Sequence, residues 1–168
     1  MVFEAPPTQY HQAQILTGSF QYGGQIESVG PIFEYINNTN RHSLSLHDVH
    51  LAPLTPGSPM KGLSRPHVIV RRNRVVFIYF AEKETRDNIR VLKRTETLVA
   101  YTSVAVCRGH FHMAQEANLG DFLDATQEAL IPVSDATVFP LIEYPAPFPQ
   151  QLDRVLIGRD QILSYHPT

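Results

Sequence analysis

The sequence predicts an all-β protein with short helices, organised as two tandem five-stranded barrels that are related by internal duplication. Three observations predict this fold class. Apolar and polar residues alternate over short segments, turn residues separate those segments, and the second half of the chain repeats the pattern of the first. Hydrophobic residues make up 43% of the 168 residues and the net charge is −2, a balance that excludes intrinsic disorder.

The repeat appears when the sequence is shifted by 87 residues, so that residues 34–76 fall on residues 121–163 without a gap. Apolar positions and turn residues stay in phase over the whole span, as a structural repeat requires. The alternative is two unrelated segments that share a β-rich rhythm. The identical pairs are Thr39 and Thr126, Asp48 and Asp135, Pro53-Leu54 and Pro140-Leu141, Val68 and Val155, and Arg72 and Arg159.

In the first copy, alternation predicts strands over residues 14–22 and 25–29, joined by a hairpin turn at Gly23-Gly24. Pro31 then begins a short helix over residues 31–38, because proline is favoured in the first turn. A third strand over 42–51 precedes a loop rich in Pro and Gly over 52–65. Two strands over 67–71 and 75–80 are expected to form a last hairpin about Arg72-Asn73.

The second copy predicts the same order of elements, with a first strand over residues 97–107 and a turn near Gly109. Asn118 is expected to cap a helix over 119–126. The remaining elements are strands over 110–114 and 130–138, a Pro-rich loop over 143–151, and a last hairpin over 154–165. A charged linker over 82–96 would separate a first barrel, 1–81, from a second, 97–168. Barrels this small are marginal alone, so we expect them to pack together or oligomerise.

The last hairpin of each copy resembles the second signature of Sm-like proteins, which are small β-barrels of the SH3 type. VLIGRDQILSY, residues 155–165, places glycine, arginine and aspartate between two apolar strands, and VIVRRNRVVFIY, residues 68–79, is a degenerate version. Residues 109–136 also resemble short bacterial proteins of unknown function, through Gly109, Leu119, Asp121, Phe122, Leu123, Ile131, Asp135 and Ala136. The resemblance implies a barrel whose edge strands can pair with neighbours in a ring or stack.

The sequence departs from the Sm-like pattern where RNA would bind. Sm-like proteins that bind uridine carry an Asp followed by an Asn in the loop after the second strand, and here the helix segment 118–126 replaces that loop. Gly158-Arg159-Asp160 inverts the usual Arg-Gly order, and the first copy has no glycine there. The RNA-site residues of the family therefore do not carry over.

A basic cluster around the last hairpin of the first copy is a candidate nucleic-acid site: Arg65, His67, Arg71, Arg72 and Arg74. Several such cations would neutralise phosphates, and the nearby aromatic residues Phe77, Tyr79 and Phe80 could stack on bases. The linker that follows alternates in sign, a pattern more typical of a solvated face. An RNA-binding regulator is accordingly an alternative function.

A weaker alternative is a metal-dependent enzyme at His110, His112 and Glu116. Two histidines two apart on a strand share a face, and imidazole with carboxylate suits a transition metal. The spacing resembles part of the first cupin motif, but Val104 stands where that motif has glycine and no second motif follows. Asp48 lies between His47 and His50, yet its match with Asp135 indicates a repeated structural residue.

The remaining features favour a cytoplasmic protein without cofactor. Cys107 is the single cysteine, which excludes a disulfide framework and favours a reducing compartment. Residues 1–14 lack a signal-peptide pattern, and the longest apolar run, 75–81, is far shorter than the ~20 residues that span a membrane. With no coherent catalytic set, we expect a non-enzymatic binding or assembly module that self-associates or scaffolds a protein complex.

Overall fold

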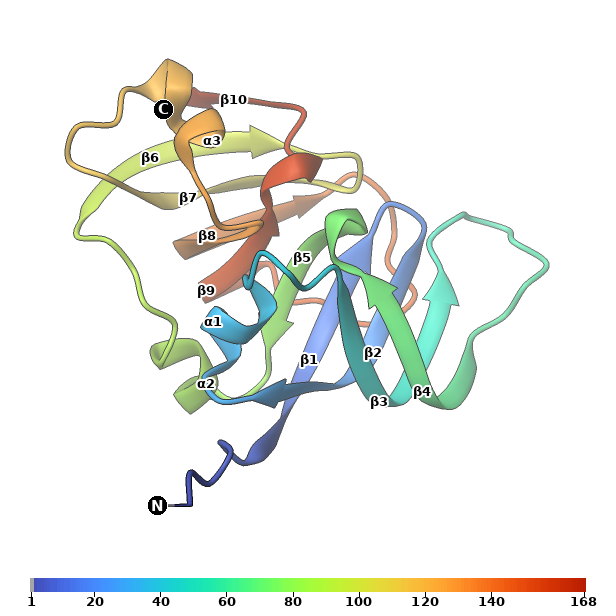
Figure 1. Cartoon of the computed structure of the whole chain (residues 1–168). Helices are drawn as coiled ribbons and strands as arrows, with labels where there is room; N and C mark the ends of the chain where they lie inside the picture. The colour runs from blue at the N-terminus through green and yellow to red at the C-terminus, as the bar shows by residue number, and fades with distance from the viewer. Residues whose placement is uncertain (1) are drawn as a thin grey trace.

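A computed structural model describes residues 2–168 and confirms an all-β fold with short helices (Figure 1). All strands belong to one sheet with the order β10-β6-β7-β8-β9-β5-β1-β2-β3-β4, and the paired strands are antiparallel. The first half contains β1 (Thr8–Thr17), β2 (Phe20–Val29), α1 (Ile32–Ile36), β3 (Ser43–Pro53), β4 (Leu63–Arg71), the 3₁₀ turn η1 (Arg72–Arg74) and β5 (Val75–Phe80). After α2 (Lys83–Asp87), the second half contains β6 (Arg94–Tyr101), β7 (Ala105–Met113), η2 (Leu119–Asp121), α3 (Phe122–Ala125), β8 (Leu130–Pro140), β9 (Gln151–Gly158), η3 (Arg159–Gln161) and β10 (Ser164–Pro167).

The two halves have the same strand order and the same ladder register. Strands β5-β1-β2-β3-β4 correspond to β10-β6-β7-β8-β9 in sequence and in neighbours. The residue numbers of matched positions differ by 85 in the first two strands and by 87 in the other three. Examples are Ile15–Tyr22 with Ala100–Cys107, Leu44–Val70 with Ile131–Ile157, and Leu16–Phe77 with Tyr101–Ser164.

The predicted turn at Gly23-Gly24 is wrong, because both glycines lie inside β2 and the chain turns at Gly18-Ser19 instead. The Oγ of Thr17 accepts hydrogen bonds from the backbone N–H groups of Ser19 (3.3 Å) and Phe20 (3.0 Å), which closes this turn. A threonine hydroxyl can satisfy turn amides in this way.

The second half turns in the same manner, so the predicted single strand over 97–107 and the turn near Gly109 are also wrong. Thr102 accepts from the N–H groups of Val104 (3.3 Å) and Ala105 (3.1 Å) between β6 and β7. Gly109 lies in the middle of β7.

Gly24 and Gly109 pack against a bulge that occurs once in each half. Asp48 and Asp135, which the sequence repeat aligns, both have left-handed backbone with φ of +53° and +48°. The ladder register shifts beside each of them. A Cβ on Gly24 would lie 3.0 Å from the carbonyl oxygen of His47, and a Cβ on Gly109 would lie 2.6 Å from Cγ1 of Val133. Each half therefore needs a glycine on its second strand where the bulge of its third strand approaches.

The predicted last hairpins are wrong, because β4 does not pair with β5 and β9 does not pair with β10 in the described sheet. After the turns η1 and η3, the chain instead crosses to the first strand of the same half, so that β5 pairs with β1 and β10 pairs with β6. Strand β5 pairs with β1 on one side and with β9 of the second half on the other. The junction between the halves is this short ladder, which pairs Phe77 with Ile157 and Ile78 with Leu156.

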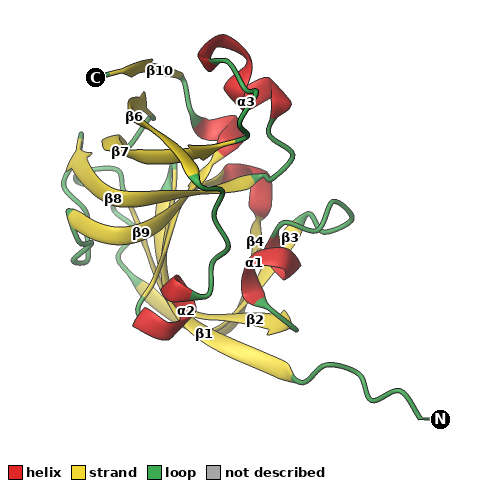
Figure 2. Ribbon diagram, turned by 90° about the vertical axis from the view of Figure 1, so that its left-hand side faces the viewer, coloured by secondary structure: helices red, strands yellow, loops and turns green. Residues whose placement is uncertain are grey.

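The hydrophobic core forms two clusters that exchange side chains across this junction. Phe77 points into the cluster of the second half, whereas its neighbour Ile78 points into that of the first. In the opposite direction, Leu156 of β9 and Leu130 of β8 pack into the cluster of the first half. Figure 1 shows β9 next to β5 where the two sets of strands meet, and Figure 2 shows the same sheet from the side.

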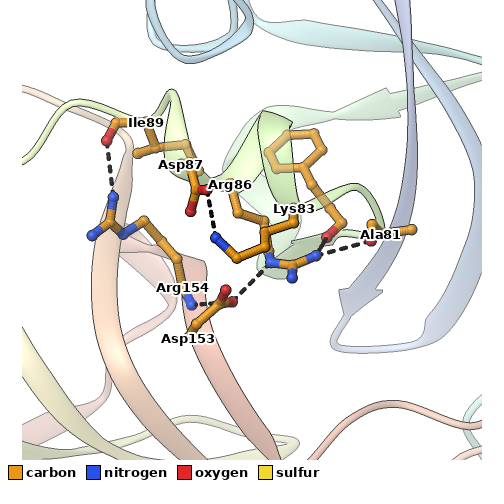
Figure 3. A network of polar contacts seen from close by, with 8 residues as sticks. Ala81, Lys83, Arg86, Asp87, Ile89, Asp153 and Arg154 are labelled. Carbon is orange, nitrogen blue, oxygen red and sulfur yellow. Dashed lines mark hydrogen bonds and ion pairs between the residues drawn. The ribbon is translucent and has the colours of Figure 1, made fainter.

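The charged segment between the halves is anchored at Arg86 (Figure 3). Its Nε donates to a carboxylate oxygen of Asp153 at 2.7 Å, and its Nη1 donates to the carbonyls of Phe80 and Ala81. Burial raises the pKa of Asp153, but hydrogen bonds from Arg86 and the Arg154 N–H outweigh it and lower the pKa. Arg154 also donates to the carbonyl of Ile89 (3.1 Å). Within residues 2–168, no helix has the length and apolar character to cross a membrane.

Candidate functional site

Strands β4 and β10 are the two open edges of the sheet, and they lie apart in both views (Figures 1 and 2). The outer side of such a strand presents backbone N–H and C=O groups without a ladder partner, which is a template for another strand. A candidate interaction site therefore exists at each end of the sheet.

The inner β5–β9 junction shows which edge residues become buried when two such units meet. Leu156 of β9 and Val76 of β5 are both fully buried there. The matching residues at the outer edges are Ile69 of β4 and Leu163 beside β10, and they are 61% and 73% exposed. The outer edges thus expose apolar side chains at the positions that the inner junction covers.

The two edges differ in charge. Strand β4 exposes Arg65 and Arg71, and Pro66 between them has no N–H to donate. The His67 ring stacks on His47 of β3, with ring centroids 4.8 Å apart. Strand β10, with the sequence SYHP, carries no formal charge when its histidine is neutral. Pairing β4 with β4 of a second copy, centred on Val68, would bring Arg65 opposite Arg71, and like charges opposite each other destabilise a ladder.

A cavity of about 120 Å³ lies between the turns η1 and η3, close to the inner junction. Three arginines line it, Arg71, Arg72 and Arg159, and Asp160 is the one carboxylate among its described lining residues. Burial lowers the pKa of Arg72, the charge of Arg159 and that of Arg41 lower it further, and Asp160 opposes them. The cavity, here called the arginine pocket, is therefore a region of concentrated positive charge.

Two arginines of this pocket also hold the helical segments in place. The Arg72 Nη1 donates to the carbonyls of Ile36 (3.0 Å) and Asn38 (2.7 Å), which follow or end α1. Arg159 donates in the same way to the carbonyls of Thr126 (2.6 Å) and Gln127 (3.3 Å), just after α3. The pair that the sequence repeat aligned thus has one anchoring role, performed once in each half.

The structure separates the basic residues that the sequence grouped as a nucleic-acid site. Arg71 and Arg72 line the arginine pocket, whereas Arg65 and His67 lie further back along β4. Arg74 is exposed in η1 and is outside the pocket lining. Sequence reasoning missed His42 and Arg159 as pocket residues, although the shift of 87 residues already placed Arg72 on Arg159.

The structure does not bring His110, His112 and Glu116 together as a metal site. The His110 Nδ1 lies 3.0 Å from the Thr97 hydroxyl. Both ring nitrogens of His112 are engaged, Nδ1 with the Leu92 carbonyl and Nε2 with the Ser134 hydroxyl, each at 2.7 Å. Burial is the main cause that lowers the pKa of His112. Among residues 2–168, no group of three or more His, Cys, Asp or Glu side chains is arranged to hold a metal ion.

Comparison with family models, curated proteins and solved structures gives no match for this chain. The resemblance to Sm-like proteins stays a prediction.

Proposed function

We propose that the protein is a non-enzymatic assembly module that binds further copies of itself through β4 and β10. In this proposal its two halves are duplicated small-barrel units, and the inner junction between them is the template for the outer one. The observation that carries the proposal is the exposure of Ile69 and Leu163 at positions where the inner junction buries Leu156 and Val76.

The inner register specifies how two copies would meet. Because β5 and β9 pair Phe77 with Ile157 and Ile78 with Leu156, β10 of one copy would pair Ser164 with Val70 and Tyr165 with Ile69 of the next. Such a contact is head-to-tail, since two different edges meet. It forms a ring if the rotation closes and a filament if it does not.

Replacing Ile69 with Asp tests this assembly. We expect the dissociation constant of the oligomer to rise by at least about tenfold, because burying an Ile side chain contributes about 1.5–3 kcal/mol and a buried carboxylate is costlier still. Light scattering over a range of protein concentrations measures the change.

The matched control is Leu92→Asp, which places the same charge at an apolar residue of similar exposure, 56%, in the segment before β6, where the corresponding residue of the first half, Pro7, is exposed as well. It should assemble like the wild type. A wild-type protein that is monomeric at every concentration would contradict the proposal, as would an Ile69→Asp variant that assembles unchanged.

We propose as a second function that the arginine pocket binds a phosphate-type oxyanion, supplied either by free phosphate or by an RNA backbone. Three guanidinium groups around one small cavity support it, since arginine presents several N–H donors to such oxygens. The cavity has several times the volume that one bound water needs.

Arg71→Ala is expected to weaken oxyanion binding several-fold, because it removes a pocket cation that does not anchor a helix. Calorimetry with inorganic phosphate and fluorescence anisotropy with single-stranded RNA distinguish the two sources. With RNA, the salt dependence of binding should also become shallower by about one phosphate contact. Arg65→Ala, on the same strand but outside the pocket, is the control, and equal effects of the two substitutions would exclude the pocket.

A further inference from the structure

The inner junction depends on a close backbone contact that only glycine permits. Gly158 is buried at the end of β9, and a Cβ added to it would overlap the carbonyl oxygen of Val75 in β5. The two backbones therefore touch at this point. Any other residue at position 158 would force the start of β5 away from β9.

The outer edge of β4 lacks this glycine. The register that matches Leu156 with Ile69 also matches Gly158 with Arg71. On the opposite edge, Ile162 corresponds to Val75, so the Cβ of Arg71 would meet the Ile162 carbonyl of a second copy docked in the inner geometry. The outer junction cannot close in the same way as the inner one.

The charge of Arg71 would still find a partner there. Asn73 lines the same cavity as Gly158, and the shift of 87 residues matches Asn73 with Asp160. In the outer junction, Asp160 of the second copy would take the place of Asn73 and lie beside Arg71. One oxygen of Asp160 accepts a hydrogen bond from Arg159 Nε of its own chain at 3.1 Å, but the side chain is 57% exposed, so its other oxygen is accessible to a second molecule.

Building on the proposed self-association, we infer that Arg71 makes the outer junction looser than the inner one and dependent on charge. Its Cβ holds β4 and β10 apart at the end where Gly158 lets β9 and β5 touch, and its guanidinium pairs with Asp160 of the next copy. Assembly between copies is then reversible and responds to ionic strength, whereas the union of the two halves within one chain is permanent.

Two substitutions at residue 71 separate the steric effect from the charge. Arg71→Ala keeps the Cβ but removes the charge, so copies should associate about two- to fivefold more weakly at low salt, as for the loss of one exposed ion pair. Arg71→Gly removes both, and it should associate more tightly than the wild type, because the backbone contact of the inner junction becomes available. The native Gly158 shows that the matching position of the unit accommodates glycine.

Sedimentation equilibrium at about 0.1 M and about 1 M NaCl measures all three proteins under weak and strong charge screening. The wild type should dissociate further at high salt, and both variants should be insensitive to it. If the Gly and Ala variants associate alike, or the wild type ignores salt, the inference is overturned. If the wild type is monomeric and only Arg71→Gly assembles, the steric role of Arg71 holds while the proposed function fails. If the wild type assembles through Ile69 and the three proteins associate equally, the proposed function holds and this inference fails.

Discussion

Replacing Gly158 with Ala is expected to lower the free energy of unfolding by about 1–3 kcal/mol, the usual cost of inserting a methyl group into a packed interior. The added Cβ would overlap a backbone oxygen of β5, which cannot rotate away as a side chain could. Strand β5 must then move as a whole, and its neighbours on both sides are central strands of the sheet. Urea denaturation at equilibrium measures the change.

Arg71→Ala is the matched control, because it introduces the same residue at the corresponding place in the other half. Position 71 already carries a Cβ and lies on an open edge, so its stability should stay within about 0.5 kcal/mol of the wild type, as for ordinary surface substitutions. Equal stability of Gly158→Ala and the wild type would show that the inner backbone contact is loose. The contrast between Gly158 and Arg71 would then lose its physical basis.

The all-β class with short helices and the repeat could be predicted because both depend on local pattern, whereas the division into two barrels stays a prediction, since all strands join one sheet. Alternation marks strands, and a shift of 87 residues keeps Asp48 on Asp135, the two residues that later prove to share left-handed backbone. The helix after Pro31 and the cap at Asn118, whose side chain accepts from the Asp121 N–H, were also predictable from short-range rules.

The glycines were misinterpreted because the same residue type serves turns and close approaches alike. The dipeptide Gly23-Gly24 alone does not show whether it forms a hairpin turn or lies inside a strand where another backbone approaches closely. The distinction lies in what stands opposite, namely the bulge at Asp48, more than 20 positions away in the sequence. The true turns, at Thr17 and Thr102, use a hydroxyl that composition alone does not single out.

The candidate site was only partly predictable, because its parts come together through pairing between distant strands. Arg71 and Arg72 could be named from their local cluster, but the position of Arg159 beside Arg72 depends on the β5–β9 junction. Ile69 and Leu163 could not be singled out, since alternation does not tell an edge strand from a central one. The histidines of β7 share a face as expected, but residues of other elements engage their ring nitrogens.

Phe77→Ala is expected to lower the free energy of unfolding by about 3–5 kcal/mol, the usual range for removing a buried phenylalanine. Phe77 is fully buried in the core cluster of the second half, where its ring lies 6.4 Å from that of Phe148. Its backbone, however, belongs to β5 of the first half and pairs with Ile157. The side chain of Phe77 therefore connects a strand of the first half to the core of the second half.

This connection predicts how the variant unfolds as well as by how much. If the two halves of the chain unfold as one cooperative unit, circular dichroism and tyrosine fluorescence should report a single transition in urea. Phe77→Ala should then shift that whole transition to lower urea concentration. Phe139→Ala is the control, because this phenylalanine of β8 is 51% exposed and its loss leaves no internal cavity. The alternative result is two separate transitions, of which Phe77→Ala shifts only the one from the second half. It would mean that the two halves fold independently and make only a weak contact. The inner junction would then be a weak contact and a poor template for association between copies.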